Sequence, residues 1–314
     1  MSAHKNEGIV VTVDRPPIGH DAALWSAALA ERLHCSLHIV YIAPEAHPMV
    51  ADIVRPHHVP ILMSAHARAT AVLDAAIAAV RRCSPDLELI GELIEGPATQ
   101  VLATIGKGAR MLVLGHPDAG TTDVLAATSR ASTITEHTTC PVTVWRGESG
   151  QLPDRRPVVL GVDEDADSAE ATRMAFEYAH LFAAPLVAVH SRPARPPPDL
   201  TTVPDLHPEQ DTLDETLSAA RQAFPDVAVT ATVVSEPPPQ ALIERAADAQ
   251  LVVIGTHGRR RMPAGAGASV SPYLFRHSPC PTMVCPPRRR RPRPDDDIAR
   301  PPRISARPPR RTTP

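Results

Sequence analysis

The chain has 314 residues, too many for one ordinary core, and its length suits two domains of about 140 residues. Apolar residues make up 43% and aromatic residues only 3%, which favours a layered α/β protein with a core of small aliphatic side chains. The net charge of -3 combines an Arg-rich tail with an acidic body, so no specific nucleic-acid binding is expected.

The sequence also lacks export and membrane signals. No uninterrupted apolar run of about 18 residues occurs, and the first residues, MSAHKNEG, lack the apolar stretch of a secretory signal. The five cysteines are odd in number and irregularly spaced, which favours reduced thiols. We therefore expect a cytoplasmic protein that has no contact with a membrane.

The first predicted element is a strand in GIVVTVD, which ends at Asp14 and is repeated as PVVLGVD before Asp163, 149 residues later. Farther along, the repeat continues at a spacing of 140 residues. The first copy therefore holds nine extra residues, which a longer loop or helix would absorb. The matched pairs are Pro97 and Pro237, Gln100 and Gln240, Leu102 and Leu242, Gly115 and Gly255, Ser129 and Ser269, Cys140 and Cys280, Pro141 and Pro281, and Val144 and Val284.

In the second copy, apolar runs alternate with helical patterns. Ser168 is a candidate N-cap for a helix that continues to Phe182. A Pro-rich loop is expected from Pro193 to Pro208. The strands are predicted at 158–162, 186–189, 227–234, 251–254 and 282–284, and the later helices at 214–224 and 240–247.

This alternation predicts an α/β fold of two tandem, doubly wound domains, each with a five-stranded parallel sheet of the Rossmann-like kind. The first domain is expected at 1–147, a linker at 148–156, and the second domain at 157–286. Residues 287–314 contain ten Arg and three Asp and bury too little apolar surface to fold.

Two segments of the second copy have chemistry suited to the ligand edge of such a sheet. Val162 and Asp163 end the first strand, and the carboxylate can accept bonds from an amine or hydroxyl, or instead cap a helix. The segment from Gly255 to Ser271 combines glycines, three arginines and the start of a helix, a combination suited to an anion. The alternative is a surface loop in which Ser269 is a simple cap.

These motifs resemble the universal stress protein family over residues 8 to 286. The family signature has Asp after the first strand and Gly-x2-Gly-x9-Gly-Ser/Thr after the fourth. Here the second copy reads Gly255-x2-Gly258-x9-Ala268-Ser269. The resemblance implies ATP in a cleft between strands one and four, and a homodimer or an intramolecular pseudo-dimer through the last strands.

The resemblance also implies a role for each matched residue of the second copy. Ala268 replaces a family glycine and is expected to weaken binding. Val162, Asp163 and the backbone near Ser191 would meet the adenine, Gly255 the ribose, and Gly258, Ala268, Ser269 and Val270 the phosphates, with Mg²⁺ as an optional companion.

The first copy departs further from the signature, since it reads Gly115-x2-Asp118-x9-Thr128-Ser129. Asp118 adds negative charge and Thr128 adds a β-branched side chain, so little ATP binding is expected there. A metal bridging Asp118 and phosphate is the alternative.

The sequence thus predicts a stress-response regulator that binds ATP in its second domain and is not an enzyme. The catalytic motifs sought are absent. Two alternatives stay open: a slow ATP hydrolase that uses His257 or Asp163, and a nucleotide-independent scaffold that recruits partners through its tail or Pro-rich loops.

Overall fold

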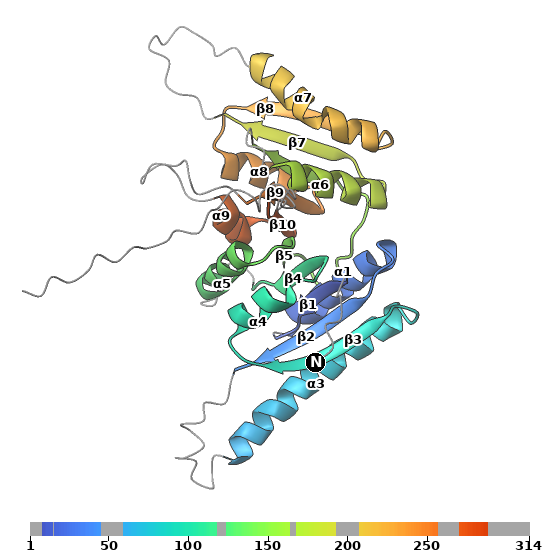
Figure 1. Ribbon diagram of the computed structural model, residues 1–314, viewed down its shortest axis with the longest axis vertical. Coiled ribbons are helices and arrows are strands. Elements are labelled where there is room, and N and C mark those ends of the chain that lie inside the picture. The colour runs from blue at the N-terminus through green and yellow to red at the C-terminus, as the bar shows by residue number, and fades with distance from the viewer. Residues whose placement is uncertain are drawn as a thin grey trace, which may run out of the picture.

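The computed structural model describes residues 8–14, 16–44, 59–117, 124–163, 168–192, 207–256 and 270–287 (Figure 1). The first half contains β1 (Ile9–Thr12), α1 (Ile18–Arg32), β2 (Leu37–Ala43), α3 (Val59–Cys83), β3 (Leu89–Glu95), α4 (Ala98–Ile105), β4 (Met111–Gly115), α5 (Val124–His137) and β5 (Val142–Trp145). The second half contains β6 (Val158–Val162), α6 (Ala169–Phe182), β7 (Leu186–Ser191), α7 (His207–Ala223), β8 (Val229–Val234), α8 (Pro238–Ala246), β9 (Leu251–Gly255), α9 (Val270–His277) and β10 (Thr282–Cys285).

The described strands form one ten-stranded sheet in the order β3-β2-β1-β4-β5-β10-β9-β6-β7-β8. Each half contributes five parallel strands, and the halves join where β5 pairs with β10 in antiparallel orientation. Figure 1 shows these two strands in the middle of the molecule, between the halves. The predicted α/β fold with five parallel strands in each half is confirmed, and the two sets of strands are joined into one sheet.

Helices cover both faces of the sheet because its central strands are apolar on both sides, as β1 and β4 illustrate. One core packs α1, α3, α6 and α7 against the sheet, and the other packs α4, α5, α8 and α9 against the opposite face. Within each half the strand order reverses beside the first strand, between β1 and β4 and between β6 and β9.

The repeat extends to individual hydrogen bonds. Beside β4, the backbone N–H of His116 donates to the carbonyl of Trp145 at 3.0 Å. At the equivalent place beside β9, the N–H of Thr256 donates to the carbonyl of Cys285 at 2.9 Å. The 140-residue spacing of the sequence is therefore a spacing of equivalent positions in the fold.

The extra residues of the first half lengthen a helix. α3 has 25 residues, whereas α7 has 17, and the two helices end at the equivalent residues Cys83 and Ala223. The difference of eight residues therefore lies at the amino end of α3. A helix extension thus accounts for nearly all of the nine-residue difference.

Two predicted boundaries were wrong because prolines lie in the first turns of helices, where a missing N–H costs no hydrogen bond. α7 begins at His207 rather than Asp214, so Pro208 belongs to the helix and not to the preceding loop. α8 begins at Pro238 rather than Gln240.

Other expected details differ by smaller amounts. β8 begins at Val229 rather than Val227. Ser168 occupies the N-cap position of α6, as predicted, but its side chain makes no capping hydrogen bond.

The two halves contact each other through helices as well as strands. Trp25 of α1 is buried and stacks on Tyr178 of α6, with ring centroids 6.2 Å apart. Arg32 of α1 lies over the Phe182 ring, 5.5 Å from its centroid. Trp25 is thus an aromatic residue of the junction between the halves.

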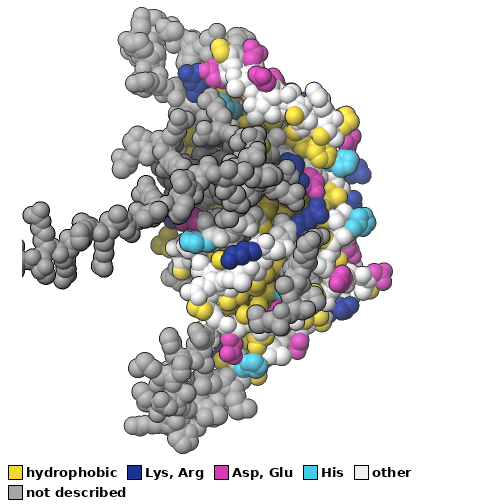
Figure 2. Space-filling view, in the orientation of Figure 1, with side chains coloured by type: hydrophobic (Ala, Val, Ile, Leu, Met, Phe, Trp, Pro, Cys, Tyr) yellow, Lys and Arg dark blue, Asp and Glu magenta, His cyan; other side chains and the backbone are white. Residues whose placement is uncertain are grey.

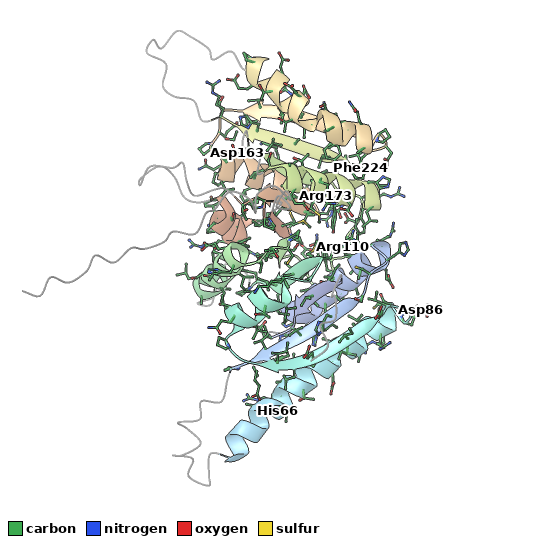
Figure 3. The ribbon with its side chains drawn as sticks, viewed as in Figure 1. His66, Asp86, Arg110, Asp163, Arg173 and Phe224 are labelled. Atoms are coloured by element: carbon green, nitrogen blue, oxygen red, sulfur yellow. The ribbon has the colours of Figure 1, made fainter. Side chains whose placement is uncertain are left out.

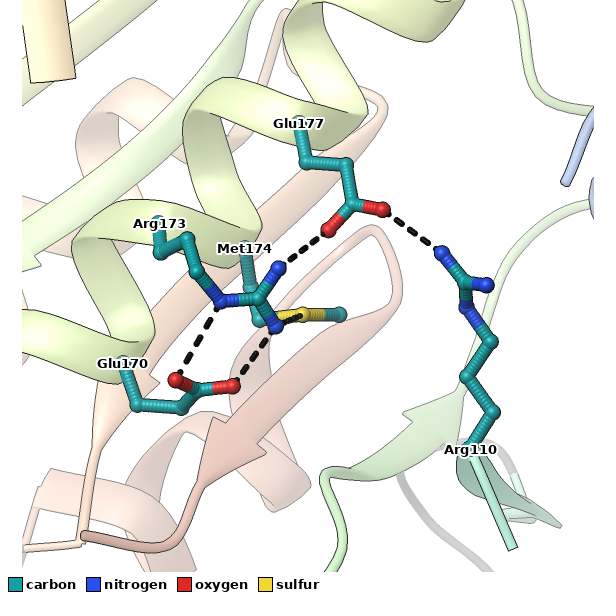
Figure 4. Close-up of polar contacts among 5 residues, drawn as sticks. All are labelled: Arg110, Glu170, Arg173, Met174 and Glu177. Atoms are coloured by element: carbon teal, nitrogen blue, oxygen red, sulfur yellow. Dashed lines mark hydrogen bonds and ion pairs between the residues drawn. The ribbon is translucent and has the colours of Figure 1, made fainter. Parts of the chain in front are cut away.

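Charged side chains also cross this junction, where Figure 3 places Arg110 and Arg173. Arg110, which precedes β4, donates to Glu177 of α6 at 2.6 Å (Figure 4). Glu177 also accepts from Arg173 at 2.6 Å, and Arg173 donates in turn to both oxygens of Glu170. The resulting chain of four side chains ties the first half to one face of α6.

Candidate functional site

The sheet of the second half brings several predicted site residues to one edge. Val162 ends β6, Ser191 ends β7 and Gly255 ends β9, and Asp163 directly follows Val162. The strands are parallel, so these ends share the carboxyl edge, next to the place where the strand order reverses. Open α/β sheets bind their ligands at this position.

Side chains hold this edge in place. The ring of His190 hydrogen-bonds the carbonyl of Val162 through Nδ1 at 3.0 Å. The hydroxyl of Ser191 donates to the backbone carbonyl of Glu236. Asp163 does not cap α6, because the N-cap position of that helix is Ser168. The helix-cap interpretation of Asp163 was therefore wrong.

The remaining predicted residues are only partly within the described chain. Val270 is the first residue of α9. Gly258, Ala268 and Ser269 lie outside the described residues, as do Arg259 to Arg261 and His257. Their proposed contacts with phosphate stay predictions.

The first half contains a cleft of about 670 Å³ at the equivalent carboxyl edge. Its floor is formed by the ends of β1, β2 and β4, and α4 and α5 form its walls. Figure 2 shows hydrophobic side chains on the visible face of the half that contains these helices. The apolar lining comes from Ile42, Leu102, Leu114, Ala127, Ala131, Ile134 and Val144.

An oppositely charged pair faces this apolar lining. Asp14 follows β1 and Arg130 projects from α5, and Arg130 Nη1 lies 3.9 Å from Asp14 Oδ2. Both side chains are about one-third exposed. Tyr41 and Thr12 add hydroxyl groups to the lining from β2 and β1.

Sequence reasoning missed Arg130, Tyr41 and Thr12. A signal for Arg130 was present, because it directly follows Ser129, the last residue of the degenerate signature. Its counterpart in the second half, 140 residues later, is Val270. The repeat therefore places a cation in the first cleft where the second half has an apolar side chain.

In the first half, Thr128 occupies the position of the third glycine of the family signature. Thr128 Oγ1 donates to the carbonyl of Val124 at 2.7 Å and lies 3.1 Å from His116 Nε2. His116 Nδ1 contacts the carbonyl of Pro117 at 2.9 Å, and both His116 and Thr128 are buried. This contact joins the end of β4 to α5. Asp118, and with it the metal-bridge alternative, lies outside the described residues.

The described residues give little support to other kinds of site. In the described ranges, no group of three or more His, Cys, Asp or Glu side chains is arranged to hold a metal ion. No helix among the described residues is both long and apolar enough to cross a membrane. Trp145, like Trp25, is buried in the core.

Comparison with known proteins identifies the repeat. The family model described as "Universal stress protein family" matches residues 5–146 and again residues 154–286. A universal stress protein of Mycobacterium tuberculosis is 30% identical over 312 residues, covering 90% of this chain and 96% of the relative. A second one from that organism is 29% identical over 272 residues, covering 82% and 89%.

Solved structures share the whole architecture. A universal stress protein from Archaeoglobus fulgidus gives a TM-score of 0.65 at 12% identity, covering 89% of this chain and 96% of the other. A functionally unknown protein from Pseudomonas aeruginosa gives 0.55 at 13% identity, covering 93% and 94%. These likenesses extend over both halves and support the fold. With the family model matched twice, the chain belongs to the universal stress protein family.

Proposed function

We propose that this protein is a stress-response regulator that binds ATP at the sheet edge of its second half and carries no dedicated catalytic machinery. One observation carries the proposal: β6, β7 and β9 end together where the strand order reverses, with Asp163, Ser191 and Gly255 at that edge. Family membership supports the same ligand class. A cytoplasmic location is part of this proposal.

The chemistry of the edge suits an adenine nucleotide. The Asp163 carboxylate can accept hydrogen bonds from an amine or a ribose hydroxyl. Gly255 has no side chain, so a ligand can approach the backbone closely there. At the amino end of α9, which begins at Val270, the first N–H groups have no partner within the helix, and the helix dipole is positive there, so this end favours phosphate.

Calorimetry with ATP tests the site assignment. Gly258→Asp copies into the second half the acidic residue that the first half has at Asp118, and it is expected to weaken ATP binding at least tenfold because the carboxylate repels phosphate. Ser218→Asp adds the same charge on the exposed side of α7 and is the matched control. Equal affinity for ATP in wild type and Gly258→Asp would contradict the proposed position of the site.

The same samples test the absence of catalysis. Phosphate release from ATP, measured with and without Mg²⁺, is expected to stay at the rate of ATP alone. Release in proportion to protein concentration would favour the slow hydrolase. Unchanged partners in a pull-down despite loss of ATP binding would favour the scaffold.

We also propose that the pairing of β5 with β10 within one chain takes the place of a homodimer through the last strands. Each of these strands has both neighbours within the chain, β4 and β10 for β5 and β9 and β5 for β10. Neither strand therefore offers an open edge to a second copy.

A further inference from the structure

The cleft of the first half has the size and lining of a small-molecule site. Its volume of about 670 Å³ lies within the common range for ligand pockets, roughly 300–1,000 Å³. The lining is mostly aliphatic and includes a few polar groups, the usual composition of such pockets. The cleft also lies at the strand-order reversal between β1 and β4.

The polar groups define the charge of a suitable ligand. Arg130 can offer a planar set of N–H donors to a carboxylate or a phosphate ester. At 3.9 Å its nearest nitrogen is beyond hydrogen-bonding distance of Asp14, so Asp14 does not use these donors in a direct bond. Asp14 in turn repels a second negative charge and can accept a bond from a ligand amine or hydroxyl.

Next to the cleft, the position of the third signature glycine carries a side chain that is engaged in buried contacts. Thr128 and His116 are 1% and 2% exposed, and their side chains lie 3.1 Å apart where the family signature has a glycine. An anion that occupied the position of Thr128 would have to break this contact and the hydrogen bond from Thr128 to Val124. Breaking buried polar contacts without replacing them is unfavourable.

We propose that the first half is a second binding site with a different ligand: a small organic anion that has an apolar or ring-shaped body and one anionic head, a carboxylate or a phosphate ester. Arg130 binds the head, the aliphatic lining of α5 and the sheet covers the body, and Asp14 accepts a donor of the ligand. The contact between Thr128 and His116 excludes a triphosphate. This site is independent of the ATP site proposed for the second half.

Calorimetry on the full chain tests the proposal with adenosine monophosphate and phenylacetate as the two probes. Gly258→Asp serves as the background, so that nucleotide binding in the second half does not contribute. At least one probe is expected to bind with one site per chain. Binding of adenosine monophosphate would identify the anionic head as a phosphate ester, and binding of phenylacetate would identify it as a carboxylate. Failure of both probes at millimolar concentration would overturn the proposal.

Variants of the cleft locate the binding. Arg130→Gln keeps most of the side chain but removes its charge, and it is expected to lower affinity for the bound probe at least tenfold. Arg276→Gln, which removes a charge in the second half, is the matched control and should bind as the background does. Equal affinity in Arg130→Gln and the background would overturn the assignment of Arg130.

A gain of function tests the exclusion of triphosphate. Asp118→Gly combined with Thr128→Ala gives the first half the same signature as the second. In the Gly258→Asp background, the double variant is expected to bind ATP at least tenfold more tightly than that background alone. No gain, in a variant with unchanged circular dichroism, would contradict the steric argument. Loss of ATP binding in Gly258→Asp itself tests the second half only, so the two proposals can fail separately.

Discussion

Three cysteine thiols are buried on or beside the central strands, where water cannot solvate a thiolate. Burial raises the pKa of Cys140 to about 12 and that of Cys280 to about 11, from an ordinary value of 9.0. Burial also raises the pKa of the Cys285 thiol, which is fully enclosed. These thiols stay protonated in the folded protein at pH values at which the unfolded chain loses their protons.

This difference predicts that stability falls as the pH rises above about 9. Because the folded state binds more protons there, the free energy of unfolding decreases with pH, and it is unaffected by these thiols well below pH 9. Between about pH 8 and pH 10 each thiol is expected to cost on the order of 1 kcal/mol, because one pH unit above the ordinary thiol pKa corresponds to roughly a tenfold change in equilibrium. Urea unfolding at the two pH values measures the loss.

Two variants separate the thiols from other alkaline effects. Cys280→Ala is expected to reduce the loss by on the order of 1 kcal/mol, since one thiol no longer titrates. Cys83→Ala removes an exposed thiol and should leave the loss unchanged. An equal loss in wild type and Cys280→Ala would show that the buried thiol does not control alkaline stability.

The candidate sites show which site residues a sequence pattern can predict and which it cannot. Asp163 and Gly255 could be placed at one edge because apolar strands followed by Asp or Gly specify where parallel strands end. Arg130 has a signal in its place directly after Ser129, but its proximity to Asp14, 116 residues away in the chain, could not be predicted from the sequence. The contact between His116 and Thr128 likewise appears only once β4 and α5 pack together.

Helix pairs at the junction combine an aromatic contact with ion pairs, and their expected strengths differ. Trp25 is 2% exposed against Tyr178, whereas the side chains of Arg110 and Glu177 are 37% and 24% exposed. Burial of a large aromatic side chain outweighs a partly solvated ion pair, for which water competes. The apolar contact between α1 and α6 is therefore expected to dominate the helix contribution to the junction.

Substitutions on these two helices test this order. Trp25→Ala is expected to lower the free energy of unfolding by about 3–5 kcal/mol, because it leaves a cavity. Glu177→Gln should cost about 1 kcal/mol or less. Urea unfolding of each variant at neutral pH measures both losses, and a larger loss for Glu177→Gln would reverse the argued order.

Tyr178→Phe is the matched control for the aromatic contact. The Tyr178 hydroxyl is buried and has no hydrogen-bond partner among the described residues. Its removal keeps the stacked ring and takes an unpaired polar group out of the core, so the free energy of unfolding should stay equal or rise. A clear loss of stability would mean that the hydroxyl has a partner.

Element types followed from the sequence more readily than element ends. Strands such as β6 and β9 are short apolar runs that are buried almost throughout. A helix with one exposed face would instead alternate apolar and polar residues at helical spacing. The start of α7 was missed because Pro208 was read as part of a loop, although proline is acceptable in a first helical turn. The extension of α3 was an open alternative, since surplus residues fit equally well in a loop.

The whole molecule is organised around a sheet that has no break between the halves. β5 and β10 pair in the centre, with Thr143 opposite Met283, and both residues are fully buried. α5 packs on α9 on one face, and Arg146 donates to the carbonyl of Phe275 at 3.2 Å. Separating the halves would expose the edges of two apolar strands and the ring of Trp25 to water.

We therefore predict that the two halves unfold together. Exposed strand edges and apolar surface make a folded half without its partner unfavourable. Both tryptophans, Trp25 and Trp145, are buried beside the junction, so their fluorescence reports its separation, while circular dichroism reports the helices of both halves. The two signals are expected to change in one coincident transition with urea, as two-state unfolding requires.

The dependence on protein concentration completes this test. If β5 and β10 pair within one chain, the midpoint of unfolding is independent of protein concentration, whereas a dimer becomes more stable as concentration rises. Leu160→Ala, in β6 of the second half, should shift the fluorescence and dichroism midpoints equally, because a cavity in one half destabilises the single unit. Separate midpoints would show that the junction holds together two domains that are each stable alone.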